Sequence, residues 1–162
     1  MPVTIREMTD EEYVSFFRWS IQSQAKDLME EGDCSWEEAL VMAETELTGI
    51  LQGPEHQRLM TVTETASGEI IGFIWMLHEE TAGRKQCFLC DFAIWEPYRR
   101  KGFGSAALAL AEKDALEAEC REVVLFVTGR NTAAKALYEK SGYRQLRPKD
   151  SGMYMIKPLS RS

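Results

Sequence analysis

Hydrophobic and polar positions follow two different periods along the first third of the chain. Val3–Met8 alternates with period two, as a half-buried strand does. Thr9 and Ser35 each precede a helical pattern and have a glutamate three residues later, which is the signature of a capping box. The pattern therefore predicts one strand, a helix ending at Gly32, and a second helix ending at Gly53-Pro54.

The rest of the chain returns to strands and then alternates strands with helices. Arg58–Glu64 and Glu69–His78 predict a hairpin, which a polar loop over Glu79–Lys85 follows. The remaining elements are predicted as a central strand over Cys87–Ile94, a helix from about Phe103, a strand over 123–127, a helix after Asn131, and final strands near Tyr143–Arg147 and Met153–Lys157. This order predicts an α/β fold, with a mixed sheet of about seven strands covered by about four helices.

Length and hydropathy narrow the class of protein. At 162 residues the chain is expected to form a single domain, 1–162, with a substantial core. No stretch has the apolar length of a membrane span, and the first thirty residues are too acidic and polar for a signal peptide. We therefore expect a cytoplasmic protein without a membrane partner.

Charge is divided unevenly along the chain. Residues 1–56 carry 13 carboxylates against 3 Arg or Lys, and residues 57–162 carry 13 against 16, so the net charge of −7 divides into −10 and +3. One reading is that the two parts bind ligands of opposite sign, with a cationic amine at the acidic part; the other is that the acidic residues are solvated helix faces. So acidic a chain argues against a nucleic-acid partner.

The four cysteines do not have the spacing of a metal site. Cys87 and Cys90 fall within one predicted strand, where residues three apart point to opposite faces. His56 and His78 form no cluster with them. We expect reduced structural thiols, in agreement with a cytosolic protein, and no metal.

The most informative stretch for function is Asp91–Ser105. It reads as the end of an apolar strand, a short loop containing Pro97, three consecutive cations (Arg99, Arg100 and Lys101), and two glycines at the start of a helix. Glycines allow backbone N–H groups to approach phosphate oxygens closely, and a helix N-terminus favours an anion. The cations add charge at the same place, so the stretch predicts a polyanionic ligand.

Spacing separates three kinds of phosphate-binding motif here. A P-loop is absent, and a dinucleotide fingerprint written as Gly102-x-Gly104-x-x-Ala107 lacks the direct turn from strand to glycine. The third pattern, Arg/Gln-x-x-Gly-x-Gly/Ala, is met by Arg99, Gly102 and Gly104. With Phe92–Ile94 and Pro97-Tyr98 before it, this stretch closely resembles the acetyl-CoA loop of the GCN5-related N-acetyltransferase (GNAT) superfamily.

A second motif extends the resemblance. After the apolar strand 123–127 comes Asn131-x-x-Ala-x-x-Leu-Tyr138-x-Lys-x-Gly-Tyr143, which is similar to the family signature in which a helix carries an Asn and a Tyr toward pantetheine and thioester. Together the motifs cover about Cys87 to Tyr143. The resemblance implies the GNAT fold, a mostly antiparallel sheet with one splayed parallel pair.

The resemblance also implies the donor, the enzyme class and the parts of the chain that serve them. The co-substrate is acetyl-CoA, residues 87–143 form its binding core, and residues 1–56 form the strand-helix-helix wall for the acceptor. The implied cofactor-binding residues are Phe92, Ala93, Ile94, Arg99, Arg100, Lys101, Gly102, Phe103, Gly104, Ser105, Asn131 and Tyr138. The implied activity is transfer of the acetyl group to a primary amine by direct attack in a ternary complex.

The resemblance makes Tyr138 the candidate general acid for the departing thiolate and the N–H near Ile94 the oxyanion donor. The general base is open. Family members often place a Glu where this chain has Phe88 and Phe126. Asp91 is the leading candidate because a carboxylate in an apolar strand is paired or functional, and the others are His78, Glu79 and Glu80, acting through water.

Two other functions stay open at this point. A CoA-binding sensor, or a GNAT domain without turnover, would explain the missing glutamate; it would bind CoA and acetylate nothing. A nucleotide-dependent oxidoreductase would instead bind NAD(P). The sequence names neither the amine, which is a small molecule or a peptide amine, nor the oligomeric state, which is a monomer or a homodimer.

Overall fold

The structure is a computed structural model and describes residues 2–53 and 56–160. The chain divides into two compact units, Met8–Pro54, and Met1–Glu7 together with Glu55–Ser162. Pro54, the expected stop of the second helix, lies outside the described residues. The two units are considered separately below.

The unit Met8–Pro54 is a pair of helices, α1 (Asp10–Glu31) and α2 (Trp36–Leu51). Both predicted capping boxes form: the N–H of Glu12 donates to Oγ1 of Thr9 at 3.2 Å, and the N–H of Thr9 donates to Glu12 at 2.9 Å, with the same exchange between Ser35 and Glu38. Three fully buried alanines, Ala25, Ala39 and Ala43, lie where the helices meet. Their small side chains let the two backbones approach closely.

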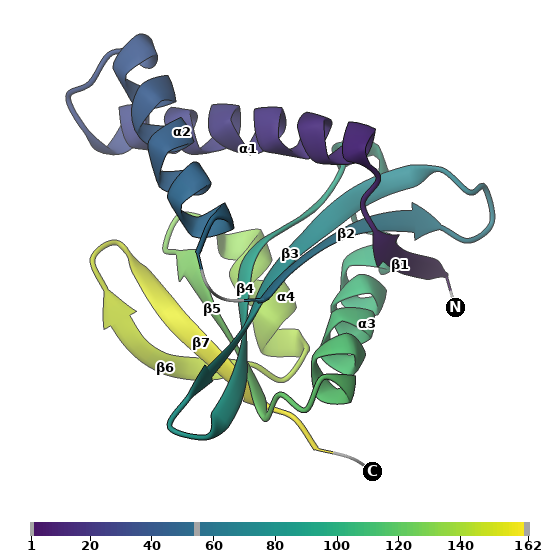
Figure 1. Cartoon of the computed structure of the whole chain (residues 1–162). Coiled ribbons are helices and arrows are strands. Elements are labelled where there is room, and N and C mark those ends of the chain that lie inside the picture. Colours follow the sequence, from purple (N-terminus) through teal and green to yellow (C-terminus); the bar gives the residue numbers. More distant parts are fainter. Residues whose placement is uncertain (1, 54–55, 161–162) are drawn as a thin grey trace. The chain divides into compact units, whose positions relative to one another are not determined.

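The other unit is built on a seven-stranded sheet in the order β1-β2-β3-β4-β5-β7-β6 (Figure 1). Every neighbouring pair is antiparallel except β4–β5, which is parallel. The predicted GNAT-type mixed sheet with four helices is confirmed. The strands are β1 (Val3–Glu7), β2 (His56–Glu64), β3 (Ile70–Thr81), β4 (Arg84–Ile94), β5 (Glu122–Thr128), β6 (Arg144–Lys149) and β7 (Gly152–Pro158).

The polar loop expected over Glu79–Lys85 is wrong. Strands β3 and β4 continue through this stretch and are joined by a two-residue turn, Ala82-Gly83. Glu80 pairs with Lys85 across the hairpin, and their opposite charges stabilise the pairing of the two strands. The polar residues that indicated a loop are therefore cross-strand partners. Ala82 and Gly83 have φ of 54° and 76°, the backbone that short hairpin turns require.

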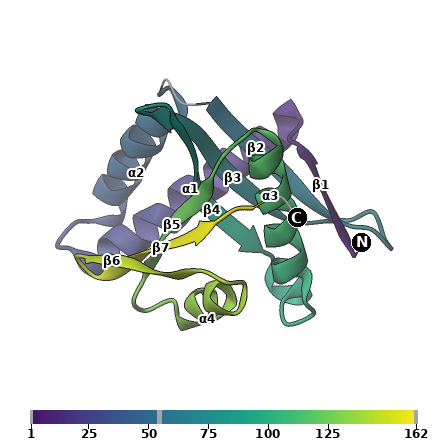
Figure 2. The ribbon, with the colours of Figure 1, turned by 90° about the horizontal axis from the view of Figure 1, so that it is seen from below.

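Helices α3 (Phe103–Glu117) and α4 (Thr132–Lys140) share one hydrophobic core with the sheet. Three small residues, Ala107, Ala111 and Ala115, are almost fully buried along α3, so the helix lies close against the strands. A bidentate ion pair ties α3 to β2, with Nη2 of Arg58 2.7 Å from Oδ1 of Asp114. In Figure 2, α4 lies beside the β6–β7 hairpin and α3 lies toward β1.

A close approach between β3 and β4 places the end of β4. Gly72 pairs with Ile94, and a Cβ added at Gly72 would stand 2.0 Å from the carbonyl oxygen of Ala93. Only glycine fits at position 72, and its close contact with Ala93 determines where the last residues of β4 lie.

We expect Gly72→Ala to destabilise the protein by about 3 kcal/mol, because backbone must move to relieve the overlap. Gly49→Ala is the matched control: Gly49 lies in α2 with no atom within 4 Å of an added Cβ, so alanine should stabilise by up to about 1 kcal/mol. Urea unfolding measures both. Equal effects of the two substitutions would contradict the close approach.

Candidate functional site

The parallel strands β4 and β5 separate soon after they meet. Within the described residues, their ladder pairs Cys87 with Val123, Phe88 with Val124 and Leu89 with Leu125, and ends there. Strand β4 continues to Ile94 and β5 to Thr128. In Figure 1 the arm of β1–β4 and the arm of β5–β7 diverge at this place. Beyond Leu89 the edge of β4 that faces β5 is therefore open to a ligand's hydrogen-bonding groups.

A β-bulge lies at the point of separation. Trp75 of β3 pairs with Asp91, whereas the next residue, Met76, pairs with Leu89, so two residues of β4, Cys90 and Asp91, span a single step of β3. Bulges bend a strand and increase its local twist. This one lies directly after the last pair of the parallel ladder and turns the end of β4 away from β5. Sequence reasoning missed it, because the stretch Leu89-Cys90-Asp91 carries no glycine or other bulge signal.

The loop after β4 is held by hydrogen bonds of its own. A short 3₁₀ turn, η1 (Glu96–Tyr98), contains Pro97. Arg99 follows, and its Nε donates to the carbonyl oxygen of Ile94 at 2.7 Å. The hydroxyl of Tyr98 donates to Glu69. Arg99, predicted as a phosphate ligand, thus uses one N–H to close the loop and retains its Nη donors.

Helix α3 presents its N-terminus beside this loop. Gly102 is the N-cap residue with φ of 82°, and no side chain caps the helix. The first helical bond runs from the N–H of Ala106 to the oxygen of Gly102, so the N–H groups of Phe103, Gly104 and Ser105 have no carbonyl partner within the described residues. Such N–H groups, with the helix dipole behind them, bind phosphate.

Two of the predicted cations surround that N-terminus. Arg100 and Lys101 are exposed, and Arg100 adopts φ of 63°, a left-handed conformation that costs a non-glycine residue about 1 kcal/mol or more. Gly104 lies against α4, since an added Cβ would be 3.4 Å from Leu137. The start of α3, next to the loop, therefore packs against α4.

Helix α4 contributes Asn131 and Tyr138. Asn131 caps the helix, with its side-chain oxygen accepting from the N–H of Ala134 at 3.1 Å. Tyr138 is buried, and its hydroxyl makes no hydrogen bond within the described residues. Burial raises the pKa of Tyr138, and the negative charge of Asp91 raises the pKa further. The two residues predicted as catalytic, Asp91 on β4 and Tyr138 on α4, thus lie close enough for the charge of one to affect the other.

The other candidate bases lie at the far end of β4. His78, Glu79 and Glu80 pair with Cys87, Gln86 and Lys85, near the hairpin turn. At about 3.3 Å per residue, Cys87 is about 7 Å along the strand from Leu89, where the ladder ends, and about 13 Å from Asp91. The structure brings Asp91 to the point of strand separation, whereas the other three residues lie opposite residues 85–87 of β4, before that point. The carboxylate of Asp91 also accepts a hydrogen bond from the N–H of Phe92 at 2.9 Å.

The two positions at which a family glutamate was expected are aromatic and lie together. The rings of Phe88 and Phe126 both contact Tyr154 of β7, at centroid distances of 6.5 and 5.1 Å. Phe126 is 37% exposed, and it is the first residue of β5 beyond the last parallel pair. Tyr154 was not singled out from the sequence, because its contact with Phe126 depends on the β5–β7 register.

Comparison with known proteins agrees with this geometry. A family model described as the acetyltransferase (GNAT) family matches residues 7–143. This chain belongs to the GNAT family.

Two relatives illustrate the match. An uncharacterised N-acetyltransferase of Bacillus subtilis, YycN, is 28% identical over 148 residues, covering 90% of this chain and 94% of the relative. The crystal structure of YycN superposes with a TM-score of 0.82 at 26% identity, covering 92% of this chain and 96% of YycN. The PaiA N-acetyltransferase of Thermoplasma acidophilum, solved in complex with coenzyme A, shares the fold at a TM-score of 0.67 and 19% identity, covering 98% and 100% of the two chains. This GNAT chain is accordingly an N-acetyltransferase by family.

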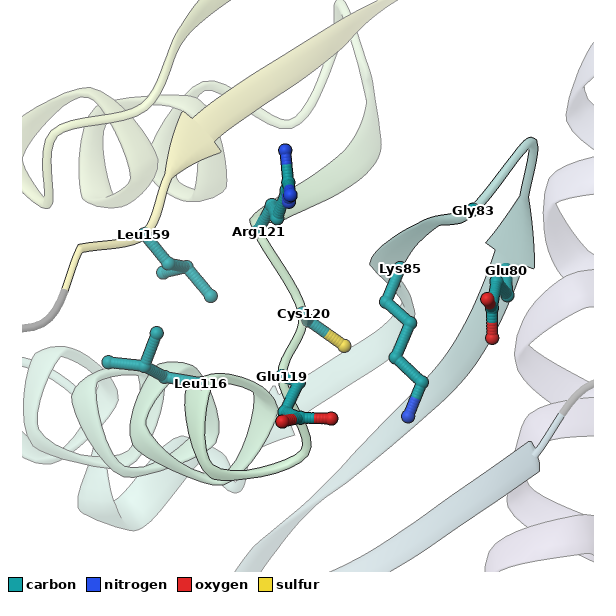
Figure 3. A pocket seen from close by; sticks show the side chains of 8 residues that line it. All are labelled: Glu80, Gly83, Lys85, Leu116, Glu119, Cys120, Arg121 and Leu159. Atoms are coloured by element: carbon teal, nitrogen blue, oxygen red, sulfur yellow. The ribbon is translucent and has the colours of Figure 1, made fainter.

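A separate pocket of about 530 Å³ opens at the other end of α3 in this GNAT chain (Figure 3). Lys85, Cys120 and Arg121 are among its lining side chains. Helix α3 has 15 residues and is about 22 Å long, so this pocket is remote from the helix N-terminus that faces the phosphate loop.

Three further features concern the described residues only. They contain no group of three or more His, Cys, Asp or Glu side chains placed to hold a metal ion. Their helices include none long and apolar enough to cross a membrane. All four cysteines are free thiols. The predictions of a cytoplasmic location and of no metal stay predictions.

His78 is buried beside the ion pair of Arg58 and Asp114. Its Nε2 lies 3.9 Å from Oδ2 of Asp114, beyond hydrogen-bond distance, and has no hydrogen-bond partner within the described residues. Burial lowers the pKa of His78, against the smaller opposing effect of Asp114. The imidazole of the folded protein is therefore neutral at pH 7.

We expect stability to fall as the pH is lowered from 7.5 to 5.5. The unfolded chain takes up a proton at His78 near pH 6.5, and the folded protein, with its lowered pKa, resists this proton, so the free energy of unfolding drops by up to about 1.4 kcal/mol per pH unit. Urea titrations of the wild type and His78→Gln at both pH values measure this. The variant should lose most of this slope, while His56→Gln, which removes the exposed second histidine, should keep it. An unchanged slope in His78→Gln would contradict the assignment.

Proposed function

We propose that this protein is an acetyl-CoA-dependent enzyme that transfers the acetyl group to a primary amine by direct attack within a ternary complex. The observation that carries the proposal is the convergence at one place of the open edge of β4, the N-terminus of α3 with its basic loop, and the buried hydroxyl of Tyr138. Each has a use in holding or cleaving a thioester of CoA. We assign residues 87–143 to the CoA core and residues 1–56 to the acceptor wall.

The donor is held by backbone more than by side chains. The pyrophosphate would accept from the N–H groups of Phe103, Gly104 and Ser105, with Arg100, Lys101 and the Nη atoms of Arg99 adding charge. The pantetheine arm would pair with Phe92–Ile94 along the open edge, and Asn131 borders the arm from the cap of α4.

The chemistry follows from the bonds that change. The lone pair of the amine attacks the thioester carbonyl, a C–N bond forms, and the C–S bond breaks to release CoA thiolate. The N–H near Ile94 stabilises the oxyanion formed in between. Because burial and Asp91 raise the pKa of Tyr138, its phenol stays protonated and donates a hydrogen bond to the departing sulfur rather than transferring its proton fully.

The attacking amine must first lose a proton. Asp91 is the carboxylate at the point of strand separation and is our candidate to accept it, through water. The nitrogen loses two protons in all, one before attack and one from the tetrahedral intermediate. One of them protonates the CoA thiolate and the other is released to solvent, so no other reactant is required. The PaiA complex and a spermidine N-acetyltransferase of Vibrio cholerae solved with CoA and spermine show that this fold accommodates CoA.

Replacing Arg100 and Lys101 together by Gln should weaken acetyl-CoA binding about tenfold, because two charges beside the pyrophosphate are lost. Calorimetry measures the dissociation constant. The control is Lys113→Gln with Lys140→Gln, which removes two exposed charges from α3 and α4 away from the loop. Wild-type affinity in the loop variant, or no binding by folded wild type, would overturn the donor site.

Tyr138→Phe should lower kcat about thirtyfold, because the departing sulfur loses its hydrogen-bond donor. The affinity for acetyl-CoA and the thermal midpoint should stay nearly unchanged, because the hydroxyl makes no hydrogen bond within the described residues. Thiol release with a panel of amines measures the rate. Tyr143→Phe is the control, since its ring lies 5.7 Å from that of Tyr138 and its hydroxyl belongs to the core. Equal loss of rate in both variants would argue against Tyr138 as the donor. Binding without turnover on any amine would favour the CoA sensor.

A further inference from the structure

An aromatic and cationic cluster lies on the sheet beside the point of strand separation. It consists of Phe88, Phe126, Tyr154, Arg147 and Lys149, from β4, β5, β7 and β6. Cζ of Arg147 is 4.7 Å from the centre of the Tyr154 ring. Nζ of Lys149 is 5.8 Å from the same centre and donates to the Tyr154 hydroxyl at 3.4 Å. Both distances fall within the range of cation–π contacts.

The ring of Phe126 is held in place by packing. A Cβ added at Gly152 would be 2.3 Å from Cζ of Phe126, so the Phe126 ring lies directly over the backbone at the start of β7. Phe126 in turn meets Tyr154 edge-on, with an interplanar angle of 64°. Ring contacts and a missing side chain thus position the exposed face of Phe126 without any hydrogen bond.

The two cations are not neutralised. Within the described residues, neither Arg147 nor Lys149 forms an ion pair with a carboxylate, and Asp150 in the same hairpin turn pairs with neither. Both cations are exposed. A guanidinium over a ring keeps in-plane N–H donors whose geometry matches a carboxylate. The charge and shape of this surface are therefore complementary to an apolar segment that ends in an anion.

The position of the cluster relates it to the reaction. Phe126 follows directly after Leu125, the last residue of β5 to pair with β4. Tyr154 pairs with Phe126 one strand away, and Arg147 pairs with Tyr154 on the next strand. Since neighbouring strands lie about 4.8 Å apart, the cations above Tyr154 are roughly two strand spacings, or about 10 Å, from the opening between β4 and β5.

We propose that the acceptor is a small amino carboxylate whose amine enters at the opening between β4 and β5, whose apolar chain lies across Phe126 and Tyr154, and whose carboxylate binds Arg147 and Lys149. This inference rests on the proposed acetyl transfer and specifies its substrate. It replaces the purely cationic amine that the acidic N-terminal part suggested. Because a salt bridge to the carboxylate takes up part of the 10 Å, the amine and carboxylate are separated by roughly 6–10 Å, as in an ω-amino acid rather than an α-amino acid.

The test uses acceptors matched in pairs. Glycine, 4-aminobutyrate and 6-aminohexanoate are each compared with their carboxamides in a thiol-release assay at saturating acetyl-CoA. The wild type should prefer each longer carboxylate to its carboxamide in kcat/KM, and the preference should grow from glycine to 6-aminohexanoate. Arg147→Gln with Lys149→Gln should raise KM for 6-aminohexanoate about tenfold and change the rate on its carboxamide less than about twofold.

A charge-matched control separates local contact from net charge. Lys113→Gln with Lys140→Gln removes the same number of positive charges from α3 and α4. It should keep the wild-type preference for the carboxylate. A parallel loss in both double variants would show a general charge effect and overturn the proposed contacts.

Two failures are distinguishable. If the wild type acetylates amines but treats each carboxylate and carboxamide alike, the acetyltransferase stands and the carboxylate site is wrong. If acetyl-CoA binds and no amine is acetylated, the proposed transfer is wrong. Calorimetry then measures whether 6-acetamidohexanoate binds at the proposed carboxylate site. Binding weakened in Arg147→Gln with Lys149→Gln then supports it, and no binding, or binding that is equal in that variant and the wild type, overturns it.

Discussion

The early end of the β4–β5 ladder is the constraint on which the site depends. Two parallel strands that stayed paired to their ends would satisfy each other's backbone groups and leave no edge for a ligand. Here pairing stops after Leu125, the bulge at Cys90 and Asp91 bends β4 away, and Gly72 holds the end of β4 against β3. The chain then turns through Arg99, which binds the oxygen of Ile94, into the N-terminus of α3. The open edge for the proposed donor and the path of the chain into α3 thus both follow from one interrupted ladder.

The site and the opposite end of the sheet use charge in different ways. At the far end, the ion pair of Arg58 and Asp114 ties β2 to α3, and the neutral His78 is buried beside it. Near the opening, the charges of Arg100 and Lys101 are exposed to solvent. The phenol of Tyr138 stays protonated and neutral, because burial and Asp91 raise its pKa. A satisfied ion pair such as that of Arg58 and Asp114 stabilises a fold, whereas unneutralised groups beside an open edge retain their interactions for a ligand.

Local signals made much of this fold predictable, and long-range pairing made the rest unpredictable. The capping boxes at Thr9 and Ser35 and the glycines at the start of α3 are determined by neighbours within four residues, and all occur where the sequence indicated. The tight turn at Ala82-Gly83 was missed, because polar residues at a strand end read as loop until their partners are known. The bulge at Cys90, the bond from Arg99 to Ile94 and the Tyr154 cluster depend on register across strands or on a turn, which no local pattern encodes.

The departures from the family pattern have one physical consequence. Phenylalanine at 88 and 126 removes two carboxylate positions from the face beside the opening and replaces them with rings that pack on Tyr154. A carboxylate beside Tyr154 would offer Arg147 and Lys149 a partner of opposite charge; with aromatic rings, the two cations keep their charge for the proposed acceptor. The same substitutions leave Asp91 as the carboxylate at the strand opening. In the proposed reaction, the two phenylalanines thus account both for a base that acts through water and for an acceptor that carries a carboxylate.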